Sequence, residues 1–286
     1  MQSVDRFTYP RLLTIAGSDS CGGAGIQADL KTFSALGCYG MTAITALTAQ
    51  NTVGVQSIVP TPAAMLRTQI DSILSDVGCD AAKIGMVPDA PGIRALTQAL
   101  HTHAIPFVVL DPVVTATTGT TLMEHSAAAE LLQELAPLST LITPNLPEAR
   151  LLAERNIESV DDMLEAAHTL QQRGASAVLV KGGHMPGDTL SDVLLLADGS
   201  EHVFTDTRID TRNTHGTGCT LSAAIAAHLA LGADMLRAVQ RGRDYVRAAL
   251  AAGAHACIGH GHGPVNHGFD PQPMHTRPLS GVAAHE

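Results

Sequence analysis

Short apolar stretches of strand length alternate along the chain with stretches whose apolar residues recur every three or four positions. The first pattern predicts buried strands, and the second predicts helices that bury one face. The predicted strands span residues 11–16, 41–49, 81–86, 107–114, 138–143 and 176–181, and a hairpin joins 194–197 to 202–204. The predicted helices span residues 26–36, 62–77, 91–101, 126–135, 159–172, 217–231 and 234–253.

This repeated alternation of strand and helix is typical of βαβ units. The sequence therefore predicts an α/β fold with a mostly parallel central sheet that helices cover on both faces. Neither an internal repeat nor a low-complexity linker divides the chain, so residues 1–286 are expected to form a single domain. The two ends, residues 1–10 and about 268–286, are expected to be loose tails.

Composition narrows the class of protein. Hydrophobic residues make up 45% of the chain and charged residues 15%, which is enough apolar material for a large core. A net charge of −10, with 3% aromatic residues and no Trp, argues against nucleic-acid binding. No apolar run reaches the roughly 18 residues of a membrane span. Five cysteines without a C-x-x-C pair indicate a reduced, cytoplasmic protein.

Polar and glycine-rich segments directly follow several of the predicted strands. They read GSDSCGGAG after residue 16, GM after 84, DPVV after 110, PNLPE after 143 and KGGH after 180. In parallel sheets, ligands bind outside the carboxyl ends of the strands. We therefore expect these segments to meet in one binding site.

The strongest local signal is NTHGTGCT at residues 213–220, which leads into an alanine-rich stretch. Gly216 and Gly218 permit a tight turn whose N–H groups point the same way, and the helix start adds free N–H groups. This predicts an anion hole suited to a phosphoryl group. A helix N-terminus also lowers a thiol pKa, so Cys219 is a candidate base or nucleophile. The alternative is a glycine-rich connector followed by a small packed cysteine.

Two further strand ends carry groups that suit a nucleotide and its metal ion. Asn145 and Glu148 are three residues apart, a spacing that suits a hydrated Mg²⁺, and Asp111 follows another strand where it could share the ion. The alternative for Glu148 is a proline-framed turn that opens a helix. Lys181 precedes two glycines, as nucleotide phosphates would require. Because the chain has only three lysines, a merely solvated side chain is disfavoured there.

Other segments carry weaker signals. The chain has neither a P-loop motif nor a G-x-G-x-x-G fingerprint, so Gly22–Gly25 is interpreted as a loop that lets backbone approach a small ligand. Asp29 follows one helical turn later and either faces that ligand or is an ordinary acidic residue near a helix start. Four histidines between residues 255 and 267 are spaced too irregularly for a metal site, which favours a plain loop.

In combination, these motifs resemble a known family, the hydroxymethylpyrimidine/phosphomethylpyrimidine kinases of thiamine biosynthesis, within the ribokinase-like superfamily. The resemblance runs from about Leu12 to Val265 and rests on AGSDSCGGAGIQADLKTFSALG, ITALTAQNT, KIGM, VLDPVV, LITPNLPEA, VLVKGGH and NTHGTGCTLSAAIAA. It implies a three-layer sandwich, a homodimer, and ATP with Mg²⁺ as cofactors. The cysteine of the GTGC box separates this family from the sugar kinases and from the pyridoxal kinases that carry Asp there. Cys21 departs slightly, since the family usually has Ser at that position.

The resemblance also implies roles for individual residues. The aminopyrimidine would be surrounded by Gly17, Asp29, Gln50, Met86 and Val113. Asp111 and Glu148 would organise Mg²⁺ and its waters, while Lys181 would meet the ATP phosphates with Thr214 nearby. The anion hole would consist of Gly216, Thr217 and Gly218, with Cys219 as the base.

The implied reaction is ATP-dependent phosphorylation of 4-amino-5-hydroxymethyl-2-methylpyrimidine, then phosphorylation of the monophosphate to the diphosphate in the same site. One alternative is a pyridoxal or pyridoxine kinase, or a kinase of both substrates, since both offer a hydroxymethyl group on a six-membered aza-ring. Alternatives from other classes are a catalytically silent pyrimidine-binding sensor and a redox thiol switch at Cys219. The sensor predicts a broken catalytic set, whereas the candidate acidic, lysine and cysteine residues are all present.

Overall fold

A nine-stranded sheet forms the centre of the protein. The computed structural model describes residues 6–115, 119, 120, 122, 123, 125–183, 185 and 187–279. The strands are β2 (Arg11–Asp19), β3 (Tyr39–Gln50), β4 (Val55–Pro60), β5 (Ala81–Ile84), β6 (Val108–Leu110), β7 (Leu141–Ile142), β8 (Val178–Val180), β9 (Thr189–Leu195) and β10 (Glu201–Thr207). Their order is β10-β9-β8-β7-β6-β5-β2-β3-β4. The strands from β8 to β3 run parallel, and β4, β9 and β10 are antiparallel additions at the two edges.

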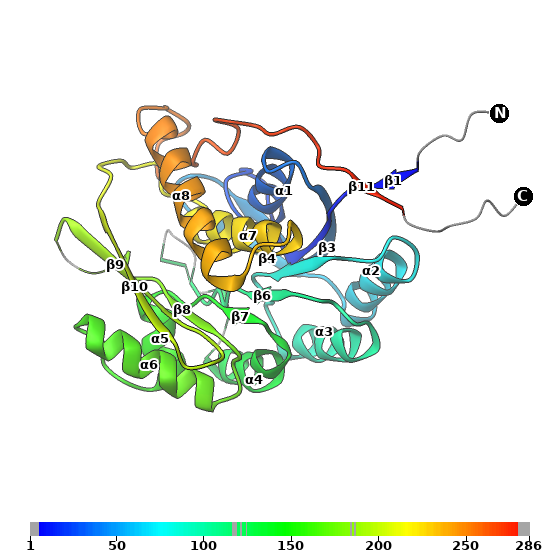
Figure 1. Ribbon diagram of the computed structural model, residues 1–286, viewed down its shortest axis with the longest axis horizontal. Helices are drawn as coiled ribbons and strands as arrows, with labels where there is room; N and C mark the ends of the chain where they lie inside the picture. Colours follow the sequence, from blue (N-terminus) through cyan, green and yellow to red (C-terminus); the bar gives the residue numbers. More distant parts are fainter. Residues whose placement is uncertain are drawn as a thin grey trace, which may run out of the picture.

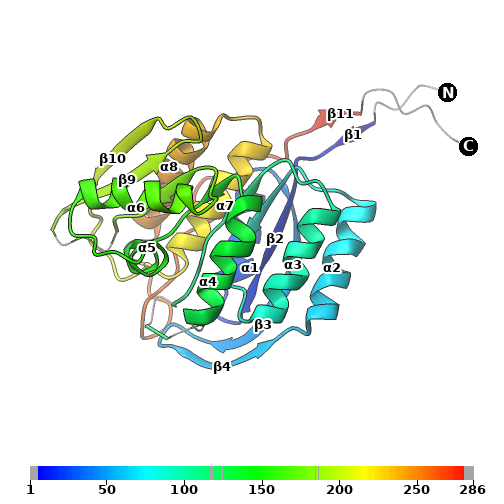
Figure 2. The same cartoon turned by 90° about the horizontal axis from the view of Figure 1, so that it is seen from below.

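Helices cover both faces of this sheet (Figure 2). One face packs against α2 (Ala63–Asp76), α3 (Ala90–Thr102), α4 (His125–Leu135), α5 (Leu146–Ala153) and α6 (Val160–Gln172), and the other against α1 (Gly25–Ala35), α7 (Thr217–Ala230) and α8 (Met235–Gly253). Successive side chains of a strand point to opposite faces. Accordingly, Leu13 and Ile15 of β2 join the core on the first face, whereas Leu12 joins the core on the second. The expected three-layer α/β sandwich is confirmed.

The predicted helices are confirmed with shifts of one or two residues at their ends. The predicted hairpin is also present, but its strands are longer than expected, because β9 begins at Thr189 and β10 extends to Thr207. The central strands β6, β7 and β8 are shorter than predicted, at two or three residues each. The reason is that buried loop residues after them, such as Val114, are as apolar as the strands themselves. The structure adds β4, an edge strand whose mostly exposed residues show no apolar run, and α5, a helix of eight residues. Elements this exposed or this short leave little periodicity in a sequence.

The described parts of the two chain ends are ordered, in contrast to the loose tails that were expected. Phe7–Thr8 (β1) pairs antiparallel with Arg277–Pro278 (β11), as Figure 1 shows at one side of the molecule. Before this pairing, the C-terminal segment crosses the body, where the His275 N–H donates to the carbonyl of Gly37 at 2.9 Å. Backbone hydrogen bonds of this kind need no apolar periodicity, so the sequence pattern did not reveal them. Residues 1–5 and 280–286 lie outside the described part of the chain.

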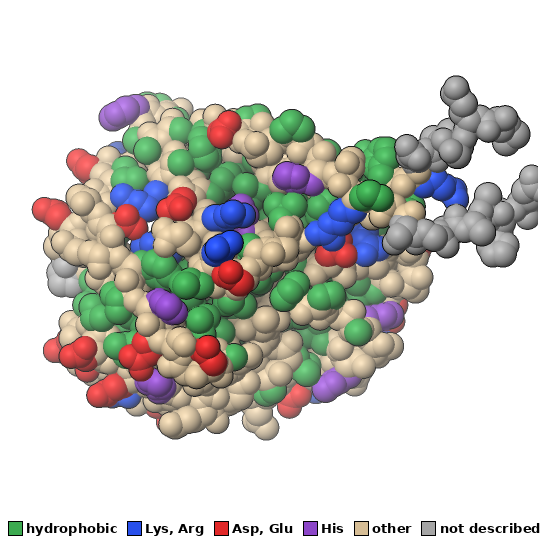
Figure 3. Space-filling view, viewed as in Figure 1, with side chains coloured by type: hydrophobic (Ala, Val, Ile, Leu, Met, Phe, Trp, Pro, Cys, Tyr) green, Lys and Arg blue, Asp and Glu red, His purple; other side chains and the backbone are tan. Residues whose placement is uncertain are grey.

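The surface mixes charges of both signs. Acidic and basic side chains lie close together on the face seen in Figure 3. Along the part of the chain that the structure describes, no helix combines the length and the apolar character needed to cross a membrane.

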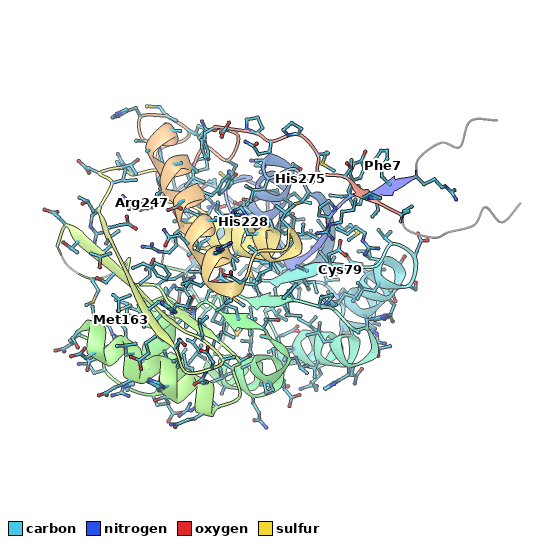
Figure 4. The ribbon with its side chains drawn as sticks, in the orientation of Figure 1. Phe7, Cys79, Met163, His228, Arg247 and His275 are labelled. Atoms are coloured by element: carbon cyan, nitrogen blue, oxygen red, sulfur yellow. The ribbon has the colours of Figure 1, made fainter. Side chains whose placement is uncertain are left out.

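A half-buried histidine on α7 is expected to make the stability of this fold sensitive to acid. Partial burial lowers the pKa of His228, labelled in Figure 4, to about 4, and the charge of Arg241 acts in the same direction. Among the residues that the structure describes, the Nδ1 atom has no hydrogen-bond partner. An unfolded histidine titrates near pH 6.5, so on acidification the unfolded chain takes up the proton first. The stability that depends on neutral His228 is therefore present above pH 6.5 and is lost as the pH falls from 6.5 to 4.

We expect His228→Leu to reduce the loss of unfolding free energy between about pH 7 and pH 5 by about 1 kcal/mol, allowing for partial solvent screening. Urea denaturation at the two pH values measures this difference. His260→Gln, which changes an exposed histidine, is the matched control and should follow the wild type. The same acid sensitivity in His228→Leu and the wild type would contradict the assignment.

Candidate active site

The loops at the carboxyl ends of the parallel strands surround a cavity of about 880 Å³. Its walls include all residues to which the family resemblance assigns a role except Asp29: Gly17, Gln50, Met86, Asp111, Val113, Glu148, Lys181, Thr214, Gly216, Thr217, Gly218 and Cys219. Tertiary structure therefore gathers segments that are up to about 200 residues apart in the sequence.

The N-terminus of α7 lies in one wall of this cavity. Gly216 is the N-cap residue with φ of +80°, and a Cβ atom there would lie 1.8 Å from the carbonyl oxygen of Gly23, so only glycine fits. Of the side chains that the structure describes, none caps the helix. Within the described residues, no protein acceptor meets the N–H groups of Gly218 and Cys219. Free N–H groups at the positive end of a 14-residue helix suit a phosphate oxygen.

A lysine–aspartate pair lies next to this helix terminus. Lys181 Nζ donates to Asp111 Oδ1 at 2.6 Å, and the Thr143 hydroxyl donates to the same oxygen at 3.0 Å. A Cβ atom on Gly218 would lie 3.4 Å from Lys181 Nζ, which shows how closely the pair approaches α7. Burial disfavours charge on Asp111, but the lysine charges outweigh it and lower the pKa of Asp111. The site therefore holds a fixed positive and a fixed negative charge beside free backbone amides.

Glu148 serves both as a helix cap and as a part of the cavity wall. The Asn145 side chain accepts the Glu148 N–H at 2.9 Å, and Glu148 Oε2 accepts the Asn145 N–H at 2.8 Å, which is a capping box at the start of α5. Glu148 can therefore both open α5, as in the proline-framed turn, and line the cavity. Burial raises the pKa of Glu148 to about 7, with the charge of Asp111 adding to the shift and that of Lys181 opposing it.

The structure corrects the expected acidity of Cys219. Burial raises the pKa of the Cys219 thiol to about 11, although the positive charge of Lys83 opposes this shift. The carboxylates of Asp29 and Asp111 add to the rise. The helix N-terminus was expected to lower this pKa, but loss of solvation and two nearby negative charges outweigh it.

Asp29 does not face the cavity as expected. Its side chain is fully buried and forms an ion pair with the equally buried Lys83, with Oδ2 and Nζ 2.9 Å apart. The Thr14 hydroxyl donates to the same oxygen at 2.6 Å, and Oδ1 has no hydrogen-bond partner in the described part of the chain. Burial opposes a charge on Lys83, but the carboxylate of Asp29 outweighs it and raises the pKa of Lys83. The charges of this pair lie close enough to Cys219 and Asp111 to affect their pKa values, and the sequence pattern did not predict the pair.

Sequence reasoning also missed a buried contact between two loops of the site. Asp19, at the end of β2, accepts the N–H groups of Gly23 and Ala24, and His215 Nε2 lies 2.9 Å from its Oδ2. Both side chains are 3% exposed. Gln50 Nε2 lies 3.4 Å from His215 Nε2. Asp19 and His215 each stand inside a recognised motif, but only the fold shows that the two motifs touch.

Comparison with known proteins finds the same family that the sequence motifs resemble. The family model for phosphomethylpyrimidine kinase matches residues 19–266. The hydroxymethylpyrimidine/phosphomethylpyrimidine kinase of Rhizobium meliloti is 49% identical over 257 residues, which cover 89% of this chain and 96% of the relative. The enzyme of the same name from Escherichia coli is 47% identical, covering 89% of this chain and 96% of that one.

Solved structures agree in fold. The phosphomethylpyrimidine kinase of Clostridium difficile matches with a TM-score of 0.75 and 40% identity, covering 84% of this chain and 99% of that chain. An ADP complex of Bacillus subtilis pyridoxal kinase matches with a TM-score of 0.83 and 37% identity, covering 91% and 98%. With the family model spanning most of the sequence and the site assembled in one cavity, the chain belongs to the phosphomethylpyrimidine kinase family.

Proposed function

We propose that the protein transfers the γ-phosphoryl group of ATP to 4-amino-5-hydroxymethyl-2-methylpyrimidine and then phosphorylates the monophosphate to the diphosphate. The main observation behind the proposal is that the free amides of α7 and the Lys181–Asp111 pair line the same cavity. Phosphoryl transfer depends on positioning and charge neutralisation more than on covalent chemistry. The relatives that share this sequence over most of its length carry the names of these two kinase activities.

The nucleotide phosphates are proposed to lie between α7 and Lys181. Related pyridoxal kinases have been solved with ADP and with the ATP analogue AMP-PCP, so the fold accepts an adenine nucleotide in those proteins. In this chain, Gly216, Thr217 and Gly218 supply the backbone of the anion site, with Thr214 in the same wall. Lys181, whose side chain is only 13% exposed, presents its charge where little water competes for it.

The donor set also fits Mg²⁺. This ion is commonly held by one or two carboxylates together with substrate phosphates and waters, and Asp111 and Glu148 are two carboxylates in the wall of one cavity. These residues would hold the ion, which when bound would neutralise charge on the phosphate oxygens. Among the described residues, no three His, Cys, Asp or Glu side chains form a cluster able to hold a metal by themselves.

Gln50 is proposed to recognise the pyrimidine. A 4-aminopyrimidine edge offers one donor, the amino group, beside one ring-nitrogen acceptor, and a glutamine amide offers the complementary pair. The Thr48 hydroxyl donates to Gln50 Oε1 at 3.2 Å, which helps to orient the amide. Met86 and Val113 supply apolar wall for the ring, and Gly17 leaves room beside Met86. Cys219 would meet the hydroxymethyl group, as a base for the first step.

A coupled ADP-release assay with ATP and the pyrimidine alcohol tests the proposal, with mass spectrometry of the products. We expect the monophosphate to form first and the diphosphate to follow. Because solved pyridoxal kinases share the fold, pyridoxal is the comparison substrate. We expect kcat/KM for the pyrimidine alcohol to exceed that for pyridoxal by at least about tenfold. A preference for pyridoxal, or no turnover of the pyrimidine, would refute the assignment.

A homodimer and a cytoplasmic location remain predictions that rest on the family resemblance and on cysteine usage. Light scattering of the purified chain tests the first of these.

A further inference from the structure

A buried arginine joins α8 to the hairpin of β9 and β10. Arg243 Nε donates to Asp192 Oδ2 at 2.8 Å, and its Nη2 donates to Asp206 Oδ2 at 2.6 Å. The guanidinium carbon also lies 4.6 Å from the ring centre of Phe204. Arg247, one turn further along α8, pairs with Asp206 as well (Figure 4). The planar guanidinium group can hold two carboxylates at once, so the positions of both acidic side chains are well defined.

Only one of these two carboxylates also touches the loop that carries Lys181. Asp192 Oδ1 accepts the N–H of Gly182 at 2.8 Å, whereas the Asp206 side chain, which also lines the cavity, forms its ion pairs within the described residues with Arg243 and Arg247 of α8. Gly182 runs so close to β9 that a Cβ atom would lie 1.8 Å from the carbonyl oxygen of Ser191. Asp192 therefore holds the peptide directly after Lys181, while Arg243 holds Asp192.

The same loop is anchored from its other side. The Lys181 N–H donates to the carbonyl of Pro144 at 2.9 Å, and its Nζ donates to Asp111. Lys181, Gly183 and Asp192 all line the main cavity. With the preceding peptide tied to Pro144 and the following one tied to Asp192, the lysine has little backbone freedom. Such preorganisation lowers the entropy that ligand binding would otherwise have to overcome.

We propose that Asp192 is a positioning residue for nucleotide binding, because it fixes the Gly182 N–H and thereby the direction in which Lys181 presents its charge to the phosphates. This inference rests on the proposed function, in which Lys181 contacts the phosphates of ATP. The competing explanation is that Asp192, like Asp206, only joins the hairpin to α8. The two explanations differ in which variants change nucleotide affinity.

The test is titration calorimetry of the full chain with AMP-PCP and, separately, with the pyrimidine alcohol. For Asp192→Ala, we expect the Kd for AMP-PCP to rise about tenfold and the Kd for the pyrimidine alcohol to stay within about twofold. Asp192→Asn keeps an oxygen acceptor for the Gly182 N–H, and we expect it to restore most of the affinity. Asp206→Asn is the matched control, since it removes charge from the same arginine without touching Gly182, and its Kd for AMP-PCP should stay within about threefold of the wild type.

Thermal denaturation of each variant shows whether the variant is folded, so that a change in Kd is not mistaken for a loss of structure. If Asp192→Ala does not fold, Asp192→Glu replaces it, because the longer side chain keeps the ion pair with Arg243 while moving the acceptor away from Gly182. An unchanged Kd for AMP-PCP in the folded variant, or an equal rise in Asp206→Asn, overturns the proposal. Because calorimetry measures the binding of AMP-PCP directly, its outcome does not depend on the kinase assay. If the wild type bound AMP-PCP but did not phosphorylate the pyrimidine, the proposed function would fail while the role of Asp192 was still decided.

Discussion

Replacement of Lys181 by methionine is expected to lower kcat/KM for ATP about a thousandfold, equivalent to about 4 kcal/mol of transition-state stabilisation. The lysine charge lies 2.6 Å from Asp111 and next to the free amides of α7, where phosphate charge has to be neutralised. In a site with little water, such a charge is worth more than on the surface. Steady-state kinetics with ATP as the varied substrate measures the loss.

The same substitution is expected to affect the stability of the fold. Asp111 is 2% exposed, so without Lys181 it becomes a buried carboxylate that lacks its closest cation. We expect a lower Tm and a higher pKa for Asp111 in the variant. Lys31→Met is the matched control, because Lys31 is an exposed lysine on α1 that donates to the carbonyl of Gly22. A Lys181→Met enzyme that stays folded and loses less than about tenfold in kcat/KM would contradict the role assigned to this lysine.

Replacement of Cys219 by alanine is expected to lower the rate of the first phosphorylation about a hundredfold and that of the second less than about tenfold. In the first step the nucleophile is a hydroxymethyl group that has to lose a proton. In the second step it is a phosphate oxygen that already carries negative charge, so a base contributes less. Separate assays, starting from the alcohol and from the monophosphate, measure the two steps. Equal losses in both would rule out a role for Cys219 as the base.

A thiol with a raised pKa can take the hydroxymethyl proton only after losing its own, so a role as base requires bound substrates to lower the pKa of Cys219. With its pKa raised by burial to about 11, the thiol of the free enzyme should react with iodoacetamide at a rate that keeps increasing above about pH 9. Reaction that already reaches its plateau near neutral pH would show a thiolate and contradict the buried environment. A high pKa also disfavours the redox-switch alternative, since redox-sensing cysteines are typically acidic and accessible. Cys219→Ser keeps a hydrogen-bonding group but no usable base, so a loss as large as that of Cys219→Ala would favour proton transfer over orientation.

Much of the site could be predicted because it is built from the loops that follow parallel strands. In a parallel sheet, each strand ends at the same edge, so DPVV, PNLPE and KGGH had to converge if their strands paired in parallel. The glycine at position 216 was also readable, since a tight turn before a helix start needs a positive φ. These features depend on local backbone geometry and on the alternation of strands and helices. The spacing of apolar residues along the sequence reveals both kinds of element.

Other features depend on neighbours that are distant in sequence. The Asp29–Lys83 pair joins α1 to β5, and both side chains are fully buried, so Asp29 is not exposed to the cavity. The contact between Asp19 and His215 joins residues 196 positions apart. Edge strand β4 and the pairing of the two chain ends rest on backbone hydrogen bonds, which impose no pattern on side chains.

The order of apolar and polar residues by itself determined the α/β class, the parallel sheet, and the helix start that offers free amides to a phosphate, because strand and helix periods and backbone turns are local properties. Tertiary structure alone decided the charge states in the site. Whether Cys219 is a thiol, whether Asp111 is ionised and which carboxylate holds the Lys181 loop all depend on burial and on charges that other segments bring near. Solvation and Coulomb energies are set by distances in space, and a linear sequence does not contain those distances.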